Sequence, residues 1–470
     1  MLEFHKKKSK NPSKTEPEKR IKDFQEIYSQ FDKNDSIEQS SRFSQCGIPY
    51  CQIHCPLNNN IPDWLRYIAE GRLEEAYQVS ASTNAFPEVC GRVCPQDRLC
   101  EGNCVVEQAG FGAITIGNLE KYLTEIAWEK GWVKNLSSQN QYKQKVAIIG
   151  SGPAGMAASA YLIQNGYKVD VYEKNDRAGG LMIYGIPNFK LDKKIVERRT
   201  EWLTDSGVVF NLNTEVGKNI SFQDLEKDYD AILIATGVYK ARQLDIDTSS
   251  VNNSIPALDF LIESNRTGLG DSPSKNKYLT AKDKHVVVIG GGDTAMDCVR
   301  TAIRQQAKEV TCLYRRNKEN MPGSAREVLN AEQEGIKFNW LSVPSKIISD
   351  SATATSMTYK VATLGEVDES GRRKPIDTGV EKQIKSDLII QALGFEPEDL
   401  NHNFKTNIEL TSWKTVKVDF KKFQTSNPKI FAAGDIVRGA SLVVWAIHDG
   451  REVAKSIHNF LQSSKIKKAS

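Results

Sequence analysis

Long apolar runs are missing from this chain of 470 residues. No stretch approaches the roughly 18 consecutive apolar residues that a membrane-spanning helix needs. The start of the chain also lacks the apolar core of a secretory signal peptide, so we expect a cytoplasmic protein. Beyond the first twenty residues, an excess of positive or negative charge is missing too. The formal net charge is +4, and the first twenty residues supply all of it, which leaves no basic surface typical of nucleic-acid binding in the rest of the chain.

Residues 1–35 combine this basic charge with proline and serine. Such a composition is typical of a polar tail that is frayed and solvated. The alternative is an arm that docks on an acidic partner. We therefore expect the folded protein to begin near residue 36.

Histidine is scarce, whereas seven of the nine cysteines fall between residues 46 and 104. Their spacing does not fit a structural zinc site, which usually has paired C-x2-C or histidine ligands. In a reducing compartment, clustered cysteines more often bind metal than form disulfides. Short-spaced cysteines followed by proline, as at Cys55 and Cys94, are typical of iron–sulfur clusters. The sequence therefore predicts a helical iron–sulfur domain, with one helix over 62–81 and another from about residue 117.

A glycine-rich turn at 150–155, G-S-G-P-A-G, lies between a predicted strand and a predicted helix. Its first glycine permits a tight turn, the second lets the backbone approach a pyrophosphate, and the third packs helix against strand. The N-terminus of the helix favours the anion. Glu173 ends the next strand, where its carboxylate can accept hydrogen bonds from a ribose diol.

A second turn, G-G-G-D-T-A at 290–295, repeats the pattern. Aligning the two modules places Tyr314 where Glu173 stands, with Arg315 and Arg316 directly after it. No carboxylate repels a 2′-phosphate there, and two guanidinium groups can bind it, which favours NADPH over NADH. The alternative is that the two arginines are ordinary surface charges.

Two different nucleotide sites in one chain are typical of a flavin reductase, in which the nicotinamide reduces FAD. The second module lies between Gly237 and Gly394, and a similar apolar strand precedes each of these glycines. We therefore predict an α/β fold: a helical iron–sulfur domain followed by two Rossmann-like dinucleotide-binding domains, with the NADPH domain inserted in the FAD domain. The expected divisions are a polar tail (1–35), the iron–sulfur domain (36–140), the FAD domain in two parts (141–280 and 395–470) and the NADPH domain (281–394).

The candidate cofactor residues come from these turns and from short glycine-containing segments near them. Those for FAD are Gly150, Gly152, Pro153, Ala154, Gly155, Glu173, Gly180, Leu181, Lys190, Thr236, Gly237, Gly434, Asp435, Ser441, Leu442 and Val443. Those for NADPH are Gly290, Gly292, Asp293, Thr294, Ala295, Arg315, Arg316 and Gly394.

Several longer motifs make the chain resemble the small (beta) subunits of NADPH-dependent glutamate synthase, over nearly everything after residue 35. The N-terminal part of dihydropyrimidine dehydrogenase is similar in architecture. The motifs are C-G-I-P-Y-C (46–51), P-E-V-C-G-R-V-C-P-Q-D-R-L-C-E-G-N-C (87–104), T-I-G-N-L-E (115–120), G-G-G-D-T-A-M-D-C (290–298), Y-R-R (314–316), N-M-P-G-S (320–324) and A-A-G-D-I-V-R-G (432–439).

The resemblance implies an electron-input subunit that moves hydride from NADPH to FAD and electrons through 4Fe–4S clusters. The implied partner is a large (alpha) subunit with glutaminase and FMN sites, which makes L-glutamate from L-glutamine and 2-oxoglutarate. One alternative is a homologous reductase that serves another acceptor, such as ferredoxin or a pyrimidine reductase. Another is a scaffold that has lost electron transfer. No catalytic residue is implied beyond the cofactors.

The resemblance also implies two 4Fe–4S clusters with interleaved ligands, and it pairs Cys90 with a cysteine that does not ligate. For Glu120, the alternative is an ordinary exposed helix residue. The implied ligands are Cys46, Cys51 and Cys104 for the first cluster, and Cys55, Cys94, Cys100 and Glu120 for the second.

One position departs from the family pattern. Relatives carry a cysteine three residues before the one that matches Cys46, and Phe43 stands there in this chain. Phenylalanine cannot ligate iron, so the first cluster is short of one ligand. The site could hold a 3Fe–4S cluster, take Ser44 or a water as a ligand, recruit Cys90, or hold no cluster.

Overall fold

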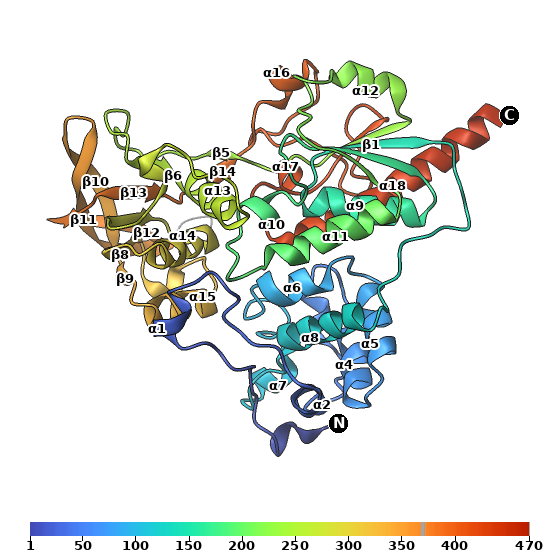
Figure 1. Cartoon of the computed structure of the whole chain (residues 1–470), viewed down its shortest axis with the longest axis horizontal. Coiled ribbons are helices and arrows are strands. Elements are labelled where there is room, and N and C mark those ends of the chain that lie inside the picture. The colour runs from blue at the N-terminus through green and yellow to red at the C-terminus, as the bar shows by residue number, and fades with distance from the viewer. Residues whose placement is uncertain (368–370, 372, 470) are drawn as a thin grey trace.

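Three groups of elements occupy separate regions of the molecule (Figure 1). The structure is a computed structural model, and it describes residues 1–367, 371 and 373–469. A helical domain comes first, followed by two domains that are each built on a parallel sheet. Among the described residues, no helix is both long and apolar enough to cross a membrane.

The helical domain contains most of the cysteines, and we call it the cysteine domain. Its core includes Trp64, Leu119 and Leu123, which are fully buried. The single helix expected over 62–81 is two helices, because Gly71 takes a left-handed conformation (φ +76°) between them. The helices are α2 (Lys33–Ser41), α3 (Tyr50–Ile53), α4 (Ile61–Ala69), α5 (Leu73–Ala81), α6 (Pro87–Val93), α7 (Val105–Gln108) and α8 (Ile116–Glu129).

The first parallel sheet has the strand order β15-β4-β1-β2-β3. Its central strand is apolar and buried on both faces, as expected where helices cover a parallel sheet. The strands are β1 (Lys145–Ile149), β2 (Lys168–Tyr172), β3 (Val209–Asn211), β4 (Ala231–Ile234) and β15 (Ile430–Ala432). The helices are α9 (Pro153–Gln164), α10 (Leu181–Tyr184), α11 (Lys193–Asp205), α12 (Phe222–Asp228), α16 (Leu400–Phe404), α17 (Asp435–Arg438) and α18 (Val443–Ala469).

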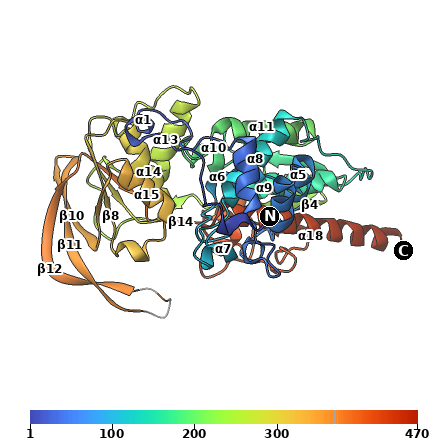
Figure 2. The same cartoon turned by 90° about the horizontal axis from the view of Figure 1, so that it is seen from below.

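The second parallel sheet repeats this arrangement, with the order β6-β13-β7-β8-β9. An antiparallel sheet (β10-β11-β12) lies beside it, at the opposite end of the molecule from the tip of α18 (Figure 2). The strands are β6 (Ser254–Pro256), β7 (His285–Ile289), β8 (Glu309–Leu313), β9 (Lys337–Asn339), β10 (Ser342–Asp350), β11 (Thr353–Val367), β12 (Arg373–Lys385) and β13 (Leu388–Gln391). The helical elements are α13 (Ala257–Gly268), η2 (Lys277–Leu279), α14 (Asp293–Arg304), η3 (Lys318–Asn320) and α15 (Ala325–Gln333).

The second sheet domain is inserted in the first, as predicted. The chain leaves through β5 (Lys240–Ala241) and returns through β14 (Phe395–Glu396), and these two strands pair antiparallel. The insertion starts earlier than the expected residue 281, however. Strand β6 pairs with β13, and α13 packs in the core of the inserted domain. The first part of the outer domain therefore ends near residue 241 and not at 280.

The first 32 residues form a strap across two domains, so the expectation of a frayed, solvated tail was wrong. The strap contains η1 (Glu3–His5) and α1 (Pro17–Arg20), and it runs from the cysteine domain to α15 (Figure 1). Arg20 is only 1% exposed, and its Nε lies 2.8 Å from Oε1 of Glu334. The basic charge of the strap is thus partly neutralised inside the molecule.

The cysteine domain and the outer sheet domain share a hydrophobic core. Leu57, Phe86 and Val89 belong to the same buried cluster as β1, α9 and α18. Glu88 of α6 and Arg199 of α11 form a buried ion pair across this boundary, with Nε 2.6 Å from Oε1. These two domains are therefore one packing unit.

Candidate functional site

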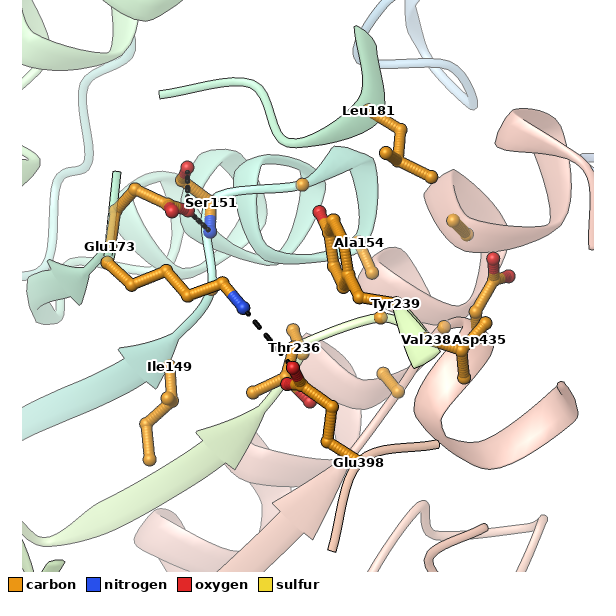
Figure 3. A pocket seen from close by; sticks show the side chains of 18 of the residues that line it. Ile149, Ser151, Ala154, Glu173, Leu181, Thr236, Val238, Tyr239, Glu398 and Asp435 are labelled. Carbon is orange, nitrogen blue, oxygen red and sulfur yellow. Dashed lines mark hydrogen bonds and ion pairs between the residues drawn. The ribbon is translucent and has the colours of Figure 1, made fainter. Parts of the chain in front are cut away.

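The largest set of predicted site residues lines one pocket in the outer sheet domain (Figure 3). Thirteen of the sixteen candidate FAD residues lie on its wall. They are Gly150, Gly152, Pro153, Ala154, Glu173, Leu181, Thr236, Gly237, Gly434, Asp435, Ser441, Leu442 and Val443.

The turn between β1 and α9 has the shape that a pyrophosphate needs. Gly150 has φ +103°, and a Cβ there would lie 2.4 Å from the carbonyl oxygen of Ala235. Gly152 has open space at the same position. Because no side chain caps α9 at Gly152, its first N–H groups are available to an anion.

Glu173 is held firmly at the end of β2. Its Oε2 accepts hydrogen bonds from the backbone N–H and the hydroxyl of Ser151, at 3.1 and 2.6 Å. Its Oε1 accepts from Asn175. The hydroxyl of Thr236 is buried on the pocket wall and has no hydrogen-bond partner among the described residues. An unpartnered buried hydroxyl of this kind fits a polar ligand in the pocket.

Tyr239, Lys174 and Glu398 are among the pocket residues that the sequence reasoning missed. Tyr239 lies inside the pocket near Ala154 (Figure 3). The ammonium of Lys174 lies 4.8 Å from the centre of the Tyr239 ring and 3.6 Å from a carboxylate oxygen of Glu398. Lys174 directly follows Glu173 in the chain, which is the one signal that could have identified it.

Three candidate FAD residues lie outside this wall. Gly155 packs α9 against the turn, because a Cβ there would lie 2.1 Å from the carbonyl oxygen of Gly150. Gly180 packs against the backbone of Gly152. The ammonium of Lys190 lies 2.8 Å from Oδ1 of Asp297, at the boundary with the inserted domain.

The second glycine-rich turn has the same construction as the first. Gly290 has φ +144°, and a Cβ there would lie 2.2 Å from the carbonyl oxygen of Ala392. Gly292 again has open space and precedes α14, whose first three residues are the candidates Asp293, Thr294 and Ala295. Gly394, with φ +91°, comes just after β13.

The predicted 2′-phosphate residues follow β8. The ring of Tyr314 lies over Gly291, where a Cβ would meet it at 2.3 Å. Arg315 is exposed, and its side chain makes no hydrogen bond or ion pair within the described part of the chain. Arg316 donates from Nε to the carbonyl of Arg373 at 2.7 Å. Arg315 is therefore the freer of the two cations.

All four side chains implied for the second cluster line one cavity in the cysteine domain. They are Cys55, Cys94, Cys100 and Glu120, with Cys90 beside them. Glu120 is 9% exposed, so an ordinary exposed helix residue is excluded. Burial raises the pKa of Glu120 to about 8, and it raises the pKa of Cys55 to about 11. Buried thiols and a buried carboxyl around a cavity fit an iron–sulfur cluster, whose positive irons would stabilise their charged forms.

The residues implied for the first cluster also converge. Cys51 and Cys104 are buried together, with Cys46 at their edge and Phe43 in the same apolar group. Burial, Cys104 and Cys46 together raise the pKa of Cys51 to about 12. Ser44 and Cys46 share a hydrogen bond of 2.9 Å between Oγ and Sγ.

Phe43 is 7% exposed and occupies core space. Phe43 therefore stands in the protein interior at the position where the family pattern has the fourth cysteine, and it supplies no ligand atom. Within the described ranges, no three His, Cys, Asp or Glu side chains surround a point where a single metal ion could bind.

The pocket and the cavity meet at the start of α18. Val443 lines the pocket, whereas its neighbour Val444 lines the cavity with Cys55, Cys94 and Cys100. A ligand in the pocket and a cluster in the cavity would therefore be separated by the first turn of one helix.

Comparisons with known proteins agree with this architecture. Residues 20–132 match the family model described as dihydropyrimidine dehydrogenase domain II, 4Fe-4S cluster, and residues 144–450 match the pyridine nucleotide-disulphide oxidoreductase model. The structure of Mycobacterium tuberculosis FprA in complex with NADPH is similar in fold, with a TM-score of 0.58 and 19% identity over 70% of this chain and 86% of that one.

Curated relatives are similar over nearly the whole chain. The glutamate synthase [NADPH] small chain of Azospirillum brasilense is 51% identical, over 98% of this chain and 97% of its own length. The small chain of Escherichia coli (strain K12) is 45% identical, over 94% of each. The predicted fold class and the resemblance are therefore confirmed: the chain belongs to the family of glutamate synthase [NADPH] small chains.

Proposed function

We propose that this chain is the electron-input subunit of a glutamate synthase. It takes hydride from NADPH and delivers electrons to a large subunit that makes L-glutamate from L-glutamine and 2-oxoglutarate. The observation that carries the proposal is the contact between the pocket and the cysteine cavity at Val443 and Val444. Bound FAD would accept a hydride and release its electrons one at a time, which a cluster can receive.

The pocket residues supply binding and orientation. The open N-terminus of α9 and the glycine turn would hold the pyrophosphate of FAD, and Glu173 would accept hydrogen bonds from its ribose. Asp435 is oriented by Ser441, whose hydroxyl donates to Oδ1 at 2.6 Å. Burial raises the pKa of Asp435. The second turn, with Arg315 and Arg316, would hold NADPH.

We also propose the cluster ligands. Cys55, Cys94, Cys100 and Glu120 would hold the cluster that lies beside the flavin pocket. The trio of Cys46, Cys51 and Cys104 would hold a second centre farther from the flavin. Because Phe43 stands where the family pattern has a cysteine, this centre would be a 3Fe–4S cluster, a cluster completed by Ser44, water or Cys90, or it would hold no cluster.

The test begins with the chain loaded with FAD, iron and sulfide under anaerobic conditions. NADPH should bleach the flavin absorbance and produce the electron paramagnetic resonance (EPR) signal of a reduced cluster. Cys100→Ala should abolish the signal of the cluster near the flavin and leave the bleaching intact. Cys298→Ala is the matched control, because Cys298 is a buried thiol of α14 outside the cavity, and its thiol points to the carbonyl of Ala257 and away from the glycine turn. A chain whose flavin is not bleached by NADPH would instead be a scaffold.

The identity of the acceptor needs a second step. Co-expression with a large chain that carries glutaminase and FMN sites should give NADPH-dependent glutamate formation. A chain that reduces its clusters but supports no glutamate formation would serve another acceptor, such as ferredoxin or a pyrimidine reductase.

A further inference from the structure

The loop between two of the proposed cluster ligands also touches the nucleotide-binding domain. This loop, residues 95–99, carries Asp97. Oδ1 of Asp97 accepts a hydrogen bond from the hydroxyl of Ser324 at 3.1 Å. Its Oδ2 accepts another from the backbone N–H of Ala325 at 3.2 Å. One carboxylate of the cysteine domain therefore holds two consecutive residues of the inserted domain.

The segment that Asp97 holds is itself bonded to the nucleotide turn. The backbone N–H of Gly323 donates to the carbonyl of Gly291 at 2.8 Å, and that of Ser324 donates to Oδ1 of Asp293 at 3.0 Å. Nη2 of Arg98 donates to the carbonyl of Gly323. A continuous series of hydrogen bonds thus runs from the cysteine loop to the turn proposed to bind NADPH.

Asp97 also supplies what the start of α15 lacks. Ser324 precedes this helix, but its side chain makes no capping hydrogen bond within the helix. Instead, its hydroxyl donates to Asp97, and Asp97 accepts the N–H of the first helical residue. A carboxylate at a helix N-terminus is stabilising, so the cap comes from another domain.

From these contacts we propose that Asp97 and Arg98 are positioning residues for the NADPH site. They fix the 323–325 segment against the glycine turn, so the turn has its binding shape only while the cysteine domain is docked. The inference rests on the proposed function, because it concerns the same nucleotide site. Asp97 and Arg98 would act through the 323–325 segment and would not need to touch the nucleotide.

The loop directly precedes Cys100, a proposed ligand of the neighbouring cluster. A nucleotide bound at the glycine turn should therefore alter the environment of that cluster. Binding free energies that are coupled in this way are reciprocal. NADP⁺ should therefore change the EPR line shape of the reduced cluster, and reduction of that cluster should change the affinity for NADP⁺.

The experiment compares variants of the FAD- and cluster-loaded protein. Asp97→Ala should weaken NADP⁺ binding by about tenfold, within the usual range of coupling between sites, as measured by the change in flavin absorbance. At saturating NADPH the rate of flavin reduction should stay within about twofold of the unmodified chain, because the flavin pocket is untouched. Ser324→Ala, which loses one of the two bonds, should weaken binding less. Asp97→Asn, which keeps an acceptor oxygen, should recover part of the affinity.

The matched control is Asp63→Ala. Asp63 is an exposed residue of α4 in the same domain, and its side chain makes no hydrogen bond or ion pair in the described part of the chain. The Asp63→Ala variant should bind NADP⁺ with the same affinity as the unmodified chain. The EPR response to NADP⁺ should persist in Asp63→Ala and disappear in Asp97→Ala.

Two results would overturn the inference while leaving the proposed function in place: equal NADP⁺ affinity in Asp97→Ala and the unmodified chain, or an unchanged EPR response in Asp97→Ala. If the unmodified chain itself neither bound NADP⁺ nor was reduced by NADPH, the proposed function would fail first, and the inference with it.

Discussion

At the scale of single residues, we propose that Arg315 makes the chain prefer NADPH over NADH. Its guanidinium is exposed and unpaired among the described residues, whereas Arg316 already donates to a backbone carbonyl. Arg315→Ala should therefore raise KM for NADPH by at least about tenfold, through the loss of a charge-assisted phosphate contact, and leave KM for NADH unchanged. Steady-state reduction of an artificial acceptor by both nucleotides measures this. An equal rise for NADH would contradict the assignment of Arg315 to the 2′-phosphate.

Phe43 is the second residue at which a substitution gives a clear prediction, in this case for the amount of bound iron. Phe43→Cys restores a thiol where the family pattern has one, so bound iron should rise. The rise should be about one iron per chain if the site holds a three-iron cluster, and about four if it holds none. Iron and sulfide quantitation with low-temperature EPR measures the change.

Phe43→Ala controls for the cavity that the substitution leaves, because it removes the same core ring without adding a ligand. Iron content that is the same in Phe43→Cys and in the unmodified chain would mean that Ser44, Cys90 or water already completes the first cluster.

At the scale of elements, α15 is tied to the strap and to α14 by a buried charge cluster around Glu334. Burial alone would raise the pKa of Glu334, but Arg304 and Arg300 outweigh it and lower that pKa to about 2. The carboxylate therefore stabilises the fold fully above about pH 4.5, its unfolded value, and the stabilisation is lost as the pH falls toward 2. The loss should reach about 3 kcal/mol of unfolding free energy.

Urea unfolding at several pH values checks this expectation. Glu334→Gln should be less stable at neutral pH by about 3–5 kcal/mol, since it leaves buried arginines without a counter-charge. Its stability should also depend less on acid than that of the unmodified chain. Glu332→Gln is the control, because Glu332 lies in the last turn of α15, two residues before Glu334, in a more exposed pair with Lys318. Parallel pH curves for Glu334→Gln and the unmodified chain would be inconsistent with this role.

The elements that the sequence predicted well are those whose signals are local. The two glycine turns predicted strand, turn and helix correctly, because positive φ at Gly150 and Gly290 and the apolar strands before them lie within a few residues. Strand β6 was assigned to the wrong domain because its partner, β13, is more than a hundred residues away in the chain. Arg20 looked solvated for the same reason: Glu334, which buries it, is remote in sequence.

The candidate site divides in the same way. Most positions predicted for FAD line one pocket, and the four positions predicted for the second cluster line one cavity. Tyr239 and Glu398 were missed, because a pocket wall is set by the packing of distant segments. Lys190 was placed with FAD, but its ammonium pairs with Asp297 of the inserted domain, which only the arrangement of the domains could reveal.

At the scale of the whole molecule, the cysteine domain and the outer sheet domain share a hydrophobic core. We therefore expect them to unfold as one unit, so that flavin release and cluster loss occur in a single thermal transition. Glu88→Ala should lower the temperatures of flavin release and of cluster loss by the same amount. It should reduce the free energy of unfolding by about 3–5 kcal/mol, because Arg199 would be left as an uncompensated buried charge. Flavin fluorescence and cluster absorbance, followed in one scan, report the two events separately. Glu75→Ala is the control, because it removes an exposed pair with Arg72 and should leave both events at the temperatures of the unmodified chain. Two transitions that separate in Glu88→Ala would show that the domains are only docked, and electrons would then have to cross a boundary that can open.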